Sequence, residues 1–171
     1  MTSEPGERGV HGSRAPLSAR VIIVSDRSAA GVRDDLSGPA ARDALEELGY
    51  QVTTVVIPDG EDGVEAALRE ALDNGVRLVV TSGGTGVGPR DRTPEGTRRV
   101  VEMELPGLAH LVLLRGLQAS AHAALSRGII GVAGRAVIAN LPGKPAAVME
   151  SLEVLLPLLP HLFDQLDGGD H

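Results

Sequence analysis

The feature that most constrains the fold of this chain is the alternation of short β-branched runs with amphipathic helical stretches. A helix with an apolar stripe, bounded by a proline and a glycine, lies between predicted strands at residues 21–24 and 50–57. A second helix over residues 61–74 leads to a third strand over residues 77–81. Because such alternation favours βαβ units with right-handed crossovers, we expect an α/β fold, a three-layer α/β/α sandwich with a mostly parallel sheet.

The second half of the chain continues this pattern less regularly. We expect helices over residues 94–104, 107–117, 145–155 and 157–166, and strands over residues 129–132 and 135–140. The helix after Pro106 is apolar on several faces. Leu108, Leu111 and Val112 are enough to form one stripe that faces the core. The remaining leucines, which a monomer would leave uncovered, are Leu113, Leu114 and Leu117. Since soluble monomers rarely leave such a patch bare, the pattern predicts a homo-oligomer.

Length and composition limit the number of domains and the classes of partner and site that the chain can have. A chain of 171 residues suits one domain, which we place at residues 20–168 after a disordered tail over residues 1–19. The net charge of −7 argues against nucleic acid and anionic membranes as partners, and no apolar stretch approaches the roughly twenty residues of a membrane span. The tail has no signal-peptide pattern, so we expect a cytoplasmic protein. Without cysteine, disulfides and thiolate sites are excluded, and the histidines have no zinc spacing.

A glycine-rich segment directly after the third predicted strand is the main candidate for binding. It has the sequence TSGGTGVGPRDRTPE over residues 81–95. Glycines let backbone N–H groups approach a ligand closely, and neighbouring hydroxyl groups add donors, which together suit phosphate oxygens. The predicted phosphate-binding residues here are Ser82, Gly83, Gly84, Thr85 and Gly86. Thr93 is expected to cap the following helix, with Pro94 in its first position and Glu95 beside its positive end.

Two aspartates, Asp59 and Asp91, follow predicted strands and are the candidate catalytic pair. On spacing alone a simpler interpretation has equal weight, in which Asp59 starts a turn and Asp91 pairs with Arg90 or Arg92 on the surface. Arg90 is also a candidate phosphate ligand, because a cationic loop beside a glycine cradle attracts an anion in an acidic chain.

Four motifs in order give the chain a family resemblance. The glycine loop resembles the GGTG…RD.TPE signature of the molybdopterin adenylyltransferase family, the MogA and MoaB proteins and their gephyrin relatives. Three further segments are similar to motifs of that family: residues 28–39, residues 57–60 and residues 140–145. The resemblance implies a MoaB/Mog-like sandwich that forms trimers or hexamers. It also implies transfer of AMP from ATP to molybdopterin, giving adenylylated molybdopterin and pyrophosphate for a downstream molybdenum-insertion protein.

The resemblance also assigns roles to residues. It makes Asp59 and Asp91 the catalytic residues and Mg²⁺ ligands, with ATP as co-substrate. It adds further substrate-binding positions, namely Arg90, Ser37, Pro142, Gly143 and Lys144. Ser37 also fits an N-cap of the first helix, and Lys144 is a departure, since the family has Asn or Ser there. Two alternatives stay open: a binding protein of the same fold without transfer activity, and a nucleotide-processing domain related to competence-damage proteins.

Overall fold

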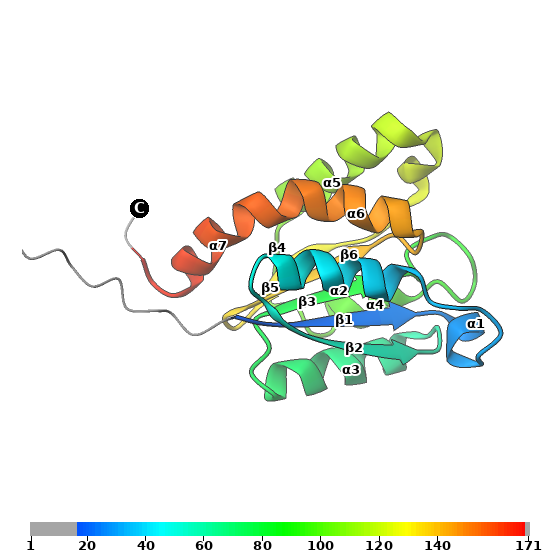
Figure 1. The fold of residues 1–171 in the computed structure, drawn as a ribbon, viewed down its shortest axis with the longest axis horizontal. Helices are drawn as coiled ribbons and strands as arrows, with labels where there is room; N and C mark the ends of the chain where they lie inside the picture. The colour runs from blue at the N-terminus through cyan, green and yellow to red at the C-terminus, as the bar shows by residue number, and fades with distance from the viewer. Residues whose placement is uncertain (1–16, 170–171) are drawn as a thin grey trace, which may run out of the picture.

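The computed structural model describes residues 17–169, which form a six-stranded sheet with helices on both faces (Figure 1). The strands are β1 (Ser18–Val24), β2 (Gln51–Ile57), β3 (Leu78–Ser82), β4 (Met103–Glu104), β5 (Ile130–Ala133) and β6 (Ala136–Leu141). Their order is β2-β1-β3-β6-β5-β4. The first four strands of that order are parallel, whereas β5 is antiparallel to both β6 and β4. The expected mostly parallel sheet is confirmed.

The helices pack as two outer layers. They are α1 (Asp26–Ala29), α2 (Ser37–Glu47), α3 (Glu61–Asp73), α4 (Thr93–Arg98), α5 (Pro106–Ala119), α6 (Pro145–Leu155) and α7 (Leu159–Leu166), with 3-10 turns η1 (Ala121–Leu125) and η2 (Leu156–Leu158). Because side chains alternate along a strand, Val21 and Ile23 of β1 pack with α2, α6 and α7, while Ile22 and Val24 pack with α3 on the other face. The two cores confirm the predicted α/β/α sandwich (Figure 1).

The C-terminal helices supply a large part of one core. The expectation that no apolar stretch approaches a membrane span was wrong for residues Pro145–Leu166, which are long and apolar enough to cross a membrane by length and composition alone. Their side chains Leu152, Leu155, Leu159 and Phe163 are nevertheless buried against the sheet. Packing inside the domain therefore accounts for part of the apolar character of this segment, of which 33% is buried.

The sheet order positions a binding site at one edge. From β1 the chain moves to β2 on one side, and it then returns to β3 on the other side of β1. In open α/β sheets, ligands bind outside the carboxyl ends of the strands at such a reversal. The loops that follow β1, β2, β3 and β6 all start at this edge.

Some predicted element bounds were wrong. The helix expected over residues 94–104 ends at Arg98, because residues 103–104 instead form β4 and pair with β5. β1 begins at Ser18, within the expected tail, and Leu17 of that tail packs against the core. Residues 1–16 lie outside the described residues. A short helix, α1, follows β1 where only a loop was expected, and Ser25 caps it by accepting the N–H of Ser28.

Both predicted helix caps were also wrong. Thr93 is the first residue of α4 rather than its cap, because its hydroxyl donates to the carbonyl oxygen of Gly83. Ser37 is likewise inside α2, and its hydroxyl donates to the carbonyl oxygen of Gly143. At the start of α2, Oδ1 of Asp35 accepts the backbone N–H groups of Ser37 and Gly38. The two hydroxyl groups thus connect loops of the site instead of closing helix ends.

Candidate functional site

The loops after β3 and β6 are held together by hydrogen bonds. The backbone N–H of Gly83 donates to the carbonyl oxygen of Leu141 (3.1 Å), and the hydroxyl of Ser82 donates to that of Pro142 (3.0 Å). From α2, the hydroxyl of Ser37 donates to Gly143 (2.9 Å). Three predicted binding segments, each from a different part of the chain, therefore form one continuous wall.

The glycine loop after β3 requires glycine for steric reasons. Gly83 and Gly84 have φ angles of 104° and 64°, in the left-handed region that side chains rarely adopt. A Cβ atom at Gly84 would collide with the hydroxyl oxygen of Thr93 and lie 3.3 Å from Oδ1 of Asp59. The loop backbone is therefore packed directly against both residues.

The same loop presents a row of backbone donors. Within residues 17–169, the N–H groups of Gly84, Thr85 and Gly86 form no hydrogen bond, and neither does the hydroxyl of Thr85. Successive free N–H groups in a glycine loop that precedes a helix are a recurring anion-binding arrangement. The loop is chemically suited to phosphate oxygens.

Asp59 belongs to a compact polar group at the ends of β1 and β2. The N–H of Asp26 donates to Oδ2 of Asp59 (2.8 Å), and the N–H of Asp59 donates to Oδ1 of Asp26 (3.0 Å). Arg90 completes the group, because it binds both carboxylate oxygens of Asp26 and the carbonyl oxygen of Asp59 (2.7 Å). The Arg90 guanidinium lowers the pKa of the Asp26 carboxyl below its ordinary value.

Asp91 lies in the loop after β3, where a backbone N–H binds its carboxylate. Its Oδ2 accepts the N–H of Gly88 (2.9 Å) within its own loop, and it forms no hydrogen bond with Asp59 among the described residues. The expected surface pairing is wrong, since Arg90 binds Asp26 and Arg92 binds Glu61. A Cβ atom at Gly86 or Gly88 would lie 2.8 Å from Oδ2 of Asp91, so these glycines make room for the carboxylate.

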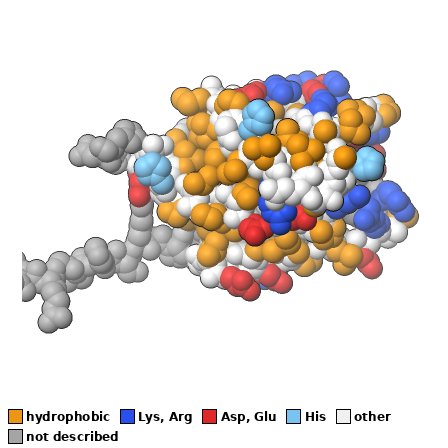
Figure 2. Space-filling model, turned by 90° about the horizontal axis from the view of Figure 1, so that it is seen from above, with side chains coloured by type: hydrophobic (Ala, Val, Ile, Leu, Met, Phe, Trp, Pro, Cys, Tyr) orange, Lys and Arg blue, Asp and Glu red, His pale blue; other side chains and the backbone are white. Residues whose placement is uncertain are grey.

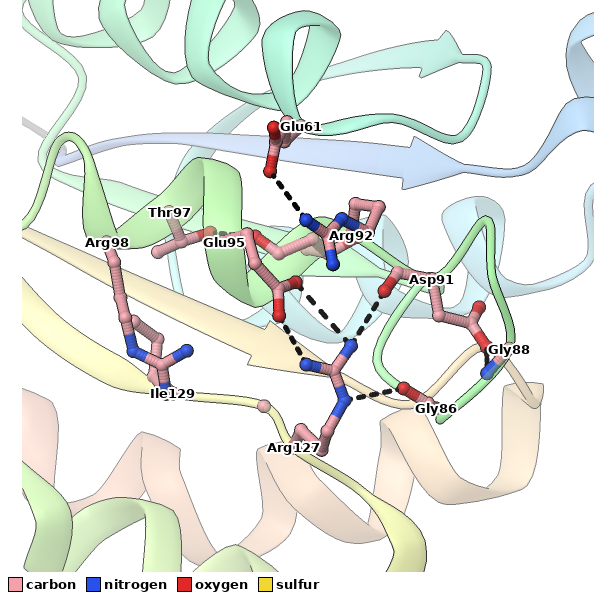
Figure 3. Close-up of polar contacts among 12 residues, drawn as sticks. Glu61, Gly86, Gly88, Asp91, Arg92, Glu95, Thr97, Arg98, Arg127 and Ile129 are labelled. Atoms are coloured by element: carbon pink, nitrogen blue, oxygen red, sulfur yellow. Dashed lines mark hydrogen bonds and ion pairs between the residues drawn. The ribbon is translucent and has the colours of Figure 1, made fainter.

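Arg127 is a residue that the sequence did not indicate. It lies between η1 and β5, and its guanidinium donates to the carbonyl oxygens of Gly86 and Asp91, each at 2.7 Å (Figure 3). It also pairs with Glu95, which lowers the pKa of that carboxyl. The N–H of Arg127 donates to the carbonyl oxygen of Thr85 (2.8 Å). Arg127 therefore fixes the glycine loop at both ends. Glu95 pairs with Arg127 and also lies in the first turn of α4, beside the positive end of that helix.

Asp59 and Asp91 have the ligand chemistry for a magnesium ion that is shared with phosphate. In residues 17–169 no group of three or more His, Asp or Glu side chains could enclose a metal. However, Mg²⁺ beside a phosphate needs only one or two carboxylates, with phosphate oxygens and water as its other ligands. Asp59 and Asp91 each keep one oxygen, Oδ1, without a hydrogen bond in the described part of the chain.

Two cavities meet at the wall formed by the loops. One of about 310 Å³ lies where the sheet order reverses, and it is lined by Ser37, Ser82 and Gly83. The other, of about 630 Å³, lies between α5 and α6 and reaches Thr85, Gly86 and Pro142. Gly143 and Lys144 line both cavities. Among the predicted site residues, those that line neither of these two cavities are Asp59, Gly84, Arg90 and Asp91.

A substitution at Gly84 tests whether the loop binds an anion. We expect Gly84→Ala to weaken the binding of AMP about tenfold or more, because the added Cβ forces the backbone away from Thr93 and Asp59. Gly107→Ala is the matched control, since a Cβ there meets no atom within 4 Å. Calorimetry on both folded variants measures the affinities. Unchanged AMP affinity in Gly84→Ala would show that the loop is only a turn.

Comparisons with known proteins find similarity to a family of probable molybdopterin-binding domains. Residues 20–161 match the MoCF_biosynth family model, described as a probable molybdopterin binding domain. The chain is 38% identical over 153 residues to a molybdopterin adenylyltransferase of Helicobacter pylori, and the match covers 87% of each protein. It is 40% identical to the Drosophila melanogaster molybdenum cofactor synthesis protein cinnamon, of which it spans only 24%. A solved structure of MogA has a TM-score of 0.84 at 45% identity, covering 87% of this chain and 99% of that one.

Proposed function

The chain belongs to the MoCF_biosynth family of probable molybdopterin-binding domains, and we propose that it transfers AMP from ATP to the terminal phosphate of molybdopterin. The observation that carries this proposal is the row of free N–H groups at Gly84, Thr85 and Gly86, which lies beside a carboxylate and borders a cavity. The adenylyltransferase relative that matches over most of both chains supports the choice of reaction. The enzyme is thus a nucleotidyltransferase of molybdenum cofactor biosynthesis.

The proposed reaction is a single phosphoryl displacement. An oxygen of the molybdopterin phosphate attacks the α-phosphorus of ATP and forms a new P–O bond. The bond between that phosphorus and the oxygen bridging to the β-phosphate breaks, and pyrophosphate leaves with the electron pair. The products are adenylylated molybdopterin and pyrophosphate, and their charges balance without a proton transfer. Catalysis therefore depends on positioning and on stabilising negative charge.

The described residues supply these two requirements. The free N–H groups of the glycine loop bind phosphate oxygens, and Arg127 keeps that loop in place. Oδ1 of Asp59, assisted by Asp91, would hold Mg²⁺. When bound, Mg²⁺ neutralises phosphate charge. Arg90 holds Asp26 against Asp59 and so orients the Asp59 carboxylate.

The function is tested by pyrophosphate release from ATP and Mg²⁺, with and without molybdopterin. The proposal predicts release only when molybdopterin is present. If both ligands bind and no pyrophosphate forms, the chain is the non-catalytic binding protein of the first alternative. If pyrophosphate forms without molybdopterin, the nucleotide-processing alternative holds.

We further propose that the protein is a trimer that buries α5. None of the 14 residues of α5 is fully buried, although Leu108 and Val112 pack partly against the core. Leu114 and Leu117 are 56% and 40% exposed. On the side of the molecule that carries α5, α6 and α7, hydrophobic side chains gather across the surface (Figure 2). A second copy that covers this face would remove the apolar surface from water.

Light scattering at micromolar concentration tests the trimer. We expect three times the chain mass of 17.7 kDa, and a shift toward the monomer mass for Leu114→Glu, because a carboxylate in an apolar interface is costly. Leu48→Glu is the control, since Leu48 is 59% exposed at the end of α2, away from α5. This variant should keep the oligomeric mass of the wild-type protein. A monomeric wild-type protein would refute the proposal.

We place this reaction in the cytoplasm, where its product serves a downstream molybdenum-insertion protein. The adenylylated product carries a new phosphoanhydride bond. Cleavage of that bond in a later reaction would release AMP.

A further inference from the structure

The cations of this chain divide sharply into paired and unpaired groups. In the described part of the chain, each arginine side chain pairs with an Asp or Glu, apart from Arg27 and Arg33. Lys144, the one lysine of the sequence, also forms no ion pair or side-chain hydrogen bond with residues 17–169. Since acidic residues outnumber basic ones, 23 to 16, an unpaired cation is exceptional here.

Two of these three cations line the same cavity. Arg33, from the loop after α1, and Lys144, from the loop after β6, both line the 310 Å³ cavity at the reversal of the sheet order, whereas Arg27 does not. A bound anion would therefore not have to compete with an existing ion pair at either side chain. The two positions are 111 residues apart in sequence, so only the fold brings them to one cavity.

The walls of this cavity are fixed by groups that are already hydrogen-bonded. The hydroxyls of Ser37 and Ser82 donate to loop carbonyls, and Oδ1 of Asp35 accepts the backbone N–H groups at the start of α2. Asp34 is the other acid in the lining. Walls that are held by hydrogen bonds and carry two free cations are suited to a ligand with several negative charges.

We propose that Arg33 and Lys144 bind the β- and γ-phosphates of a nucleoside triphosphate and make this cavity select triphosphates over monophosphates. The inference rests on the proposed function, in which these two phosphates leave as pyrophosphate. Lys144 contributes a compact point charge, and Arg33 contributes a planar group that can bind two phosphate oxygens together.

Calorimetry with the full chain tests this selectivity without molybdopterin. We expect Arg33→Gln and Lys144→Gln each to weaken the binding of ATP with Mg²⁺ roughly tenfold, and to change the affinity for AMP less than about twofold. Arg27→Gln, the unpaired cation outside the cavity, leaves both affinities unchanged. Equal losses for ATP and AMP, or no loss for ATP, would overturn the inference.

The single lysine permits a second measurement on the unmodified sequence. Reductive methylation of the wild-type protein labels only Lys144 and the terminal amine, which serves as an internal reference. We expect inorganic tripolyphosphate to slow Lys144 labelling several-fold and AMP to leave it unchanged. Labelling that tripolyphosphate does not slow would contradict the proposal.

These outcomes are separable from those of the proposed function. If AMP is transferred while the variants bind ATP normally, only the assignment of Arg33 and Lys144 fails. If the selectivity for triphosphate is found but AMP is not transferred, only the proposed reaction fails.

Discussion

Replacing Asp59 with Asn is expected to lower the rate of AMP transfer about a hundredfold or more. The amide oxygen can still accept the N–H of Asp26, so the local fold is retained while the negative charge beside Gly84 is lost. The loss should therefore appear in kcat at saturating ATP and Mg²⁺ rather than in thermal stability. Steady-state kinetics with molybdopterin and circular dichroism melting measure the two quantities.

Two other variants define what a result at Asp59 means. Asp91→Asn should cause a similar loss, because its amide oxygen keeps the bond to Gly88 and only the charge is removed. Asp62→Asn is the control, since Asp62 is a 92% exposed side chain near the start of α3. Near-normal turnover in Asp59→Asn or Asp91→Asn would contradict the catalytic role proposed for that carboxylate.

Replacing Arg127 with Gln is expected to lower kcat/KM about a hundredfold, although Arg127 is assigned no contact with the substrate. Its guanidinium holds the carbonyls of Gly86 and Asp91 and the carboxylate of Glu95 at once, and an amide side chain cannot reproduce these bonds. The free N–H groups of the loop then lose their fixed positions, so ATP binding should weaken as well. Arg115→Gln, which breaks an exposed ion pair with Glu153, should leave both quantities unchanged.

The pH dependence gives Arg127 a signature that a general loss of stability would not produce. Arg127 lowers the pKa of Glu95 in the folded protein, so the pairing is fully present above the ordinary glutamate pKa and is lost as pH falls through the lowered value. In Arg127→Gln the pairing is absent at every pH. Protonation of Glu95 should therefore no longer lower kcat/KM, and the acid limb that the pairing gives to the wild-type protein should be lost in the variant. An acid limb that is the same in both proteins would contradict a role for the pairing.

The strands and the binding loops were predictable because their signals are local. β-branched runs and glycine or proline boundaries indicate where elements begin and end, and these gave the three-layer fold. The short β4 was missed because two residues carry no periodicity, and pairing with β5 alone defines it. The side chains of Thr93 and Ser37 have the right chemistry for capping, but distant carbonyls at Gly83 and Gly143 compete successfully for their hydroxyls.

The contacts that organise the site could not be predicted from local sequence patterns, because they join residues that are far apart in the chain. Arg127 and its partner Glu95 are 32 residues apart, and Asp26 and Asp59 are 33 residues apart. Nothing in the residues around Arg127 distinguishes it from the many solvated arginines of this chain. Only the folded chain shows that one arginine supports the phosphate loop while another, Arg90, joins the loops after β1 and β2.

Transfer of radiolabel from ATP tests the central claim most directly. Purified protein is incubated with molybdopterin, Mg²⁺ and ATP labelled at either the α- or the γ-phosphate, and the pterin product is separated and identified by mass. The account predicts adenylylated molybdopterin that carries label from the α-phosphate, with the γ-label of the consumed ATP in pyrophosphate. Label from the γ-phosphate on the pterin, or an unlabelled pterin after both incubations, would contradict it.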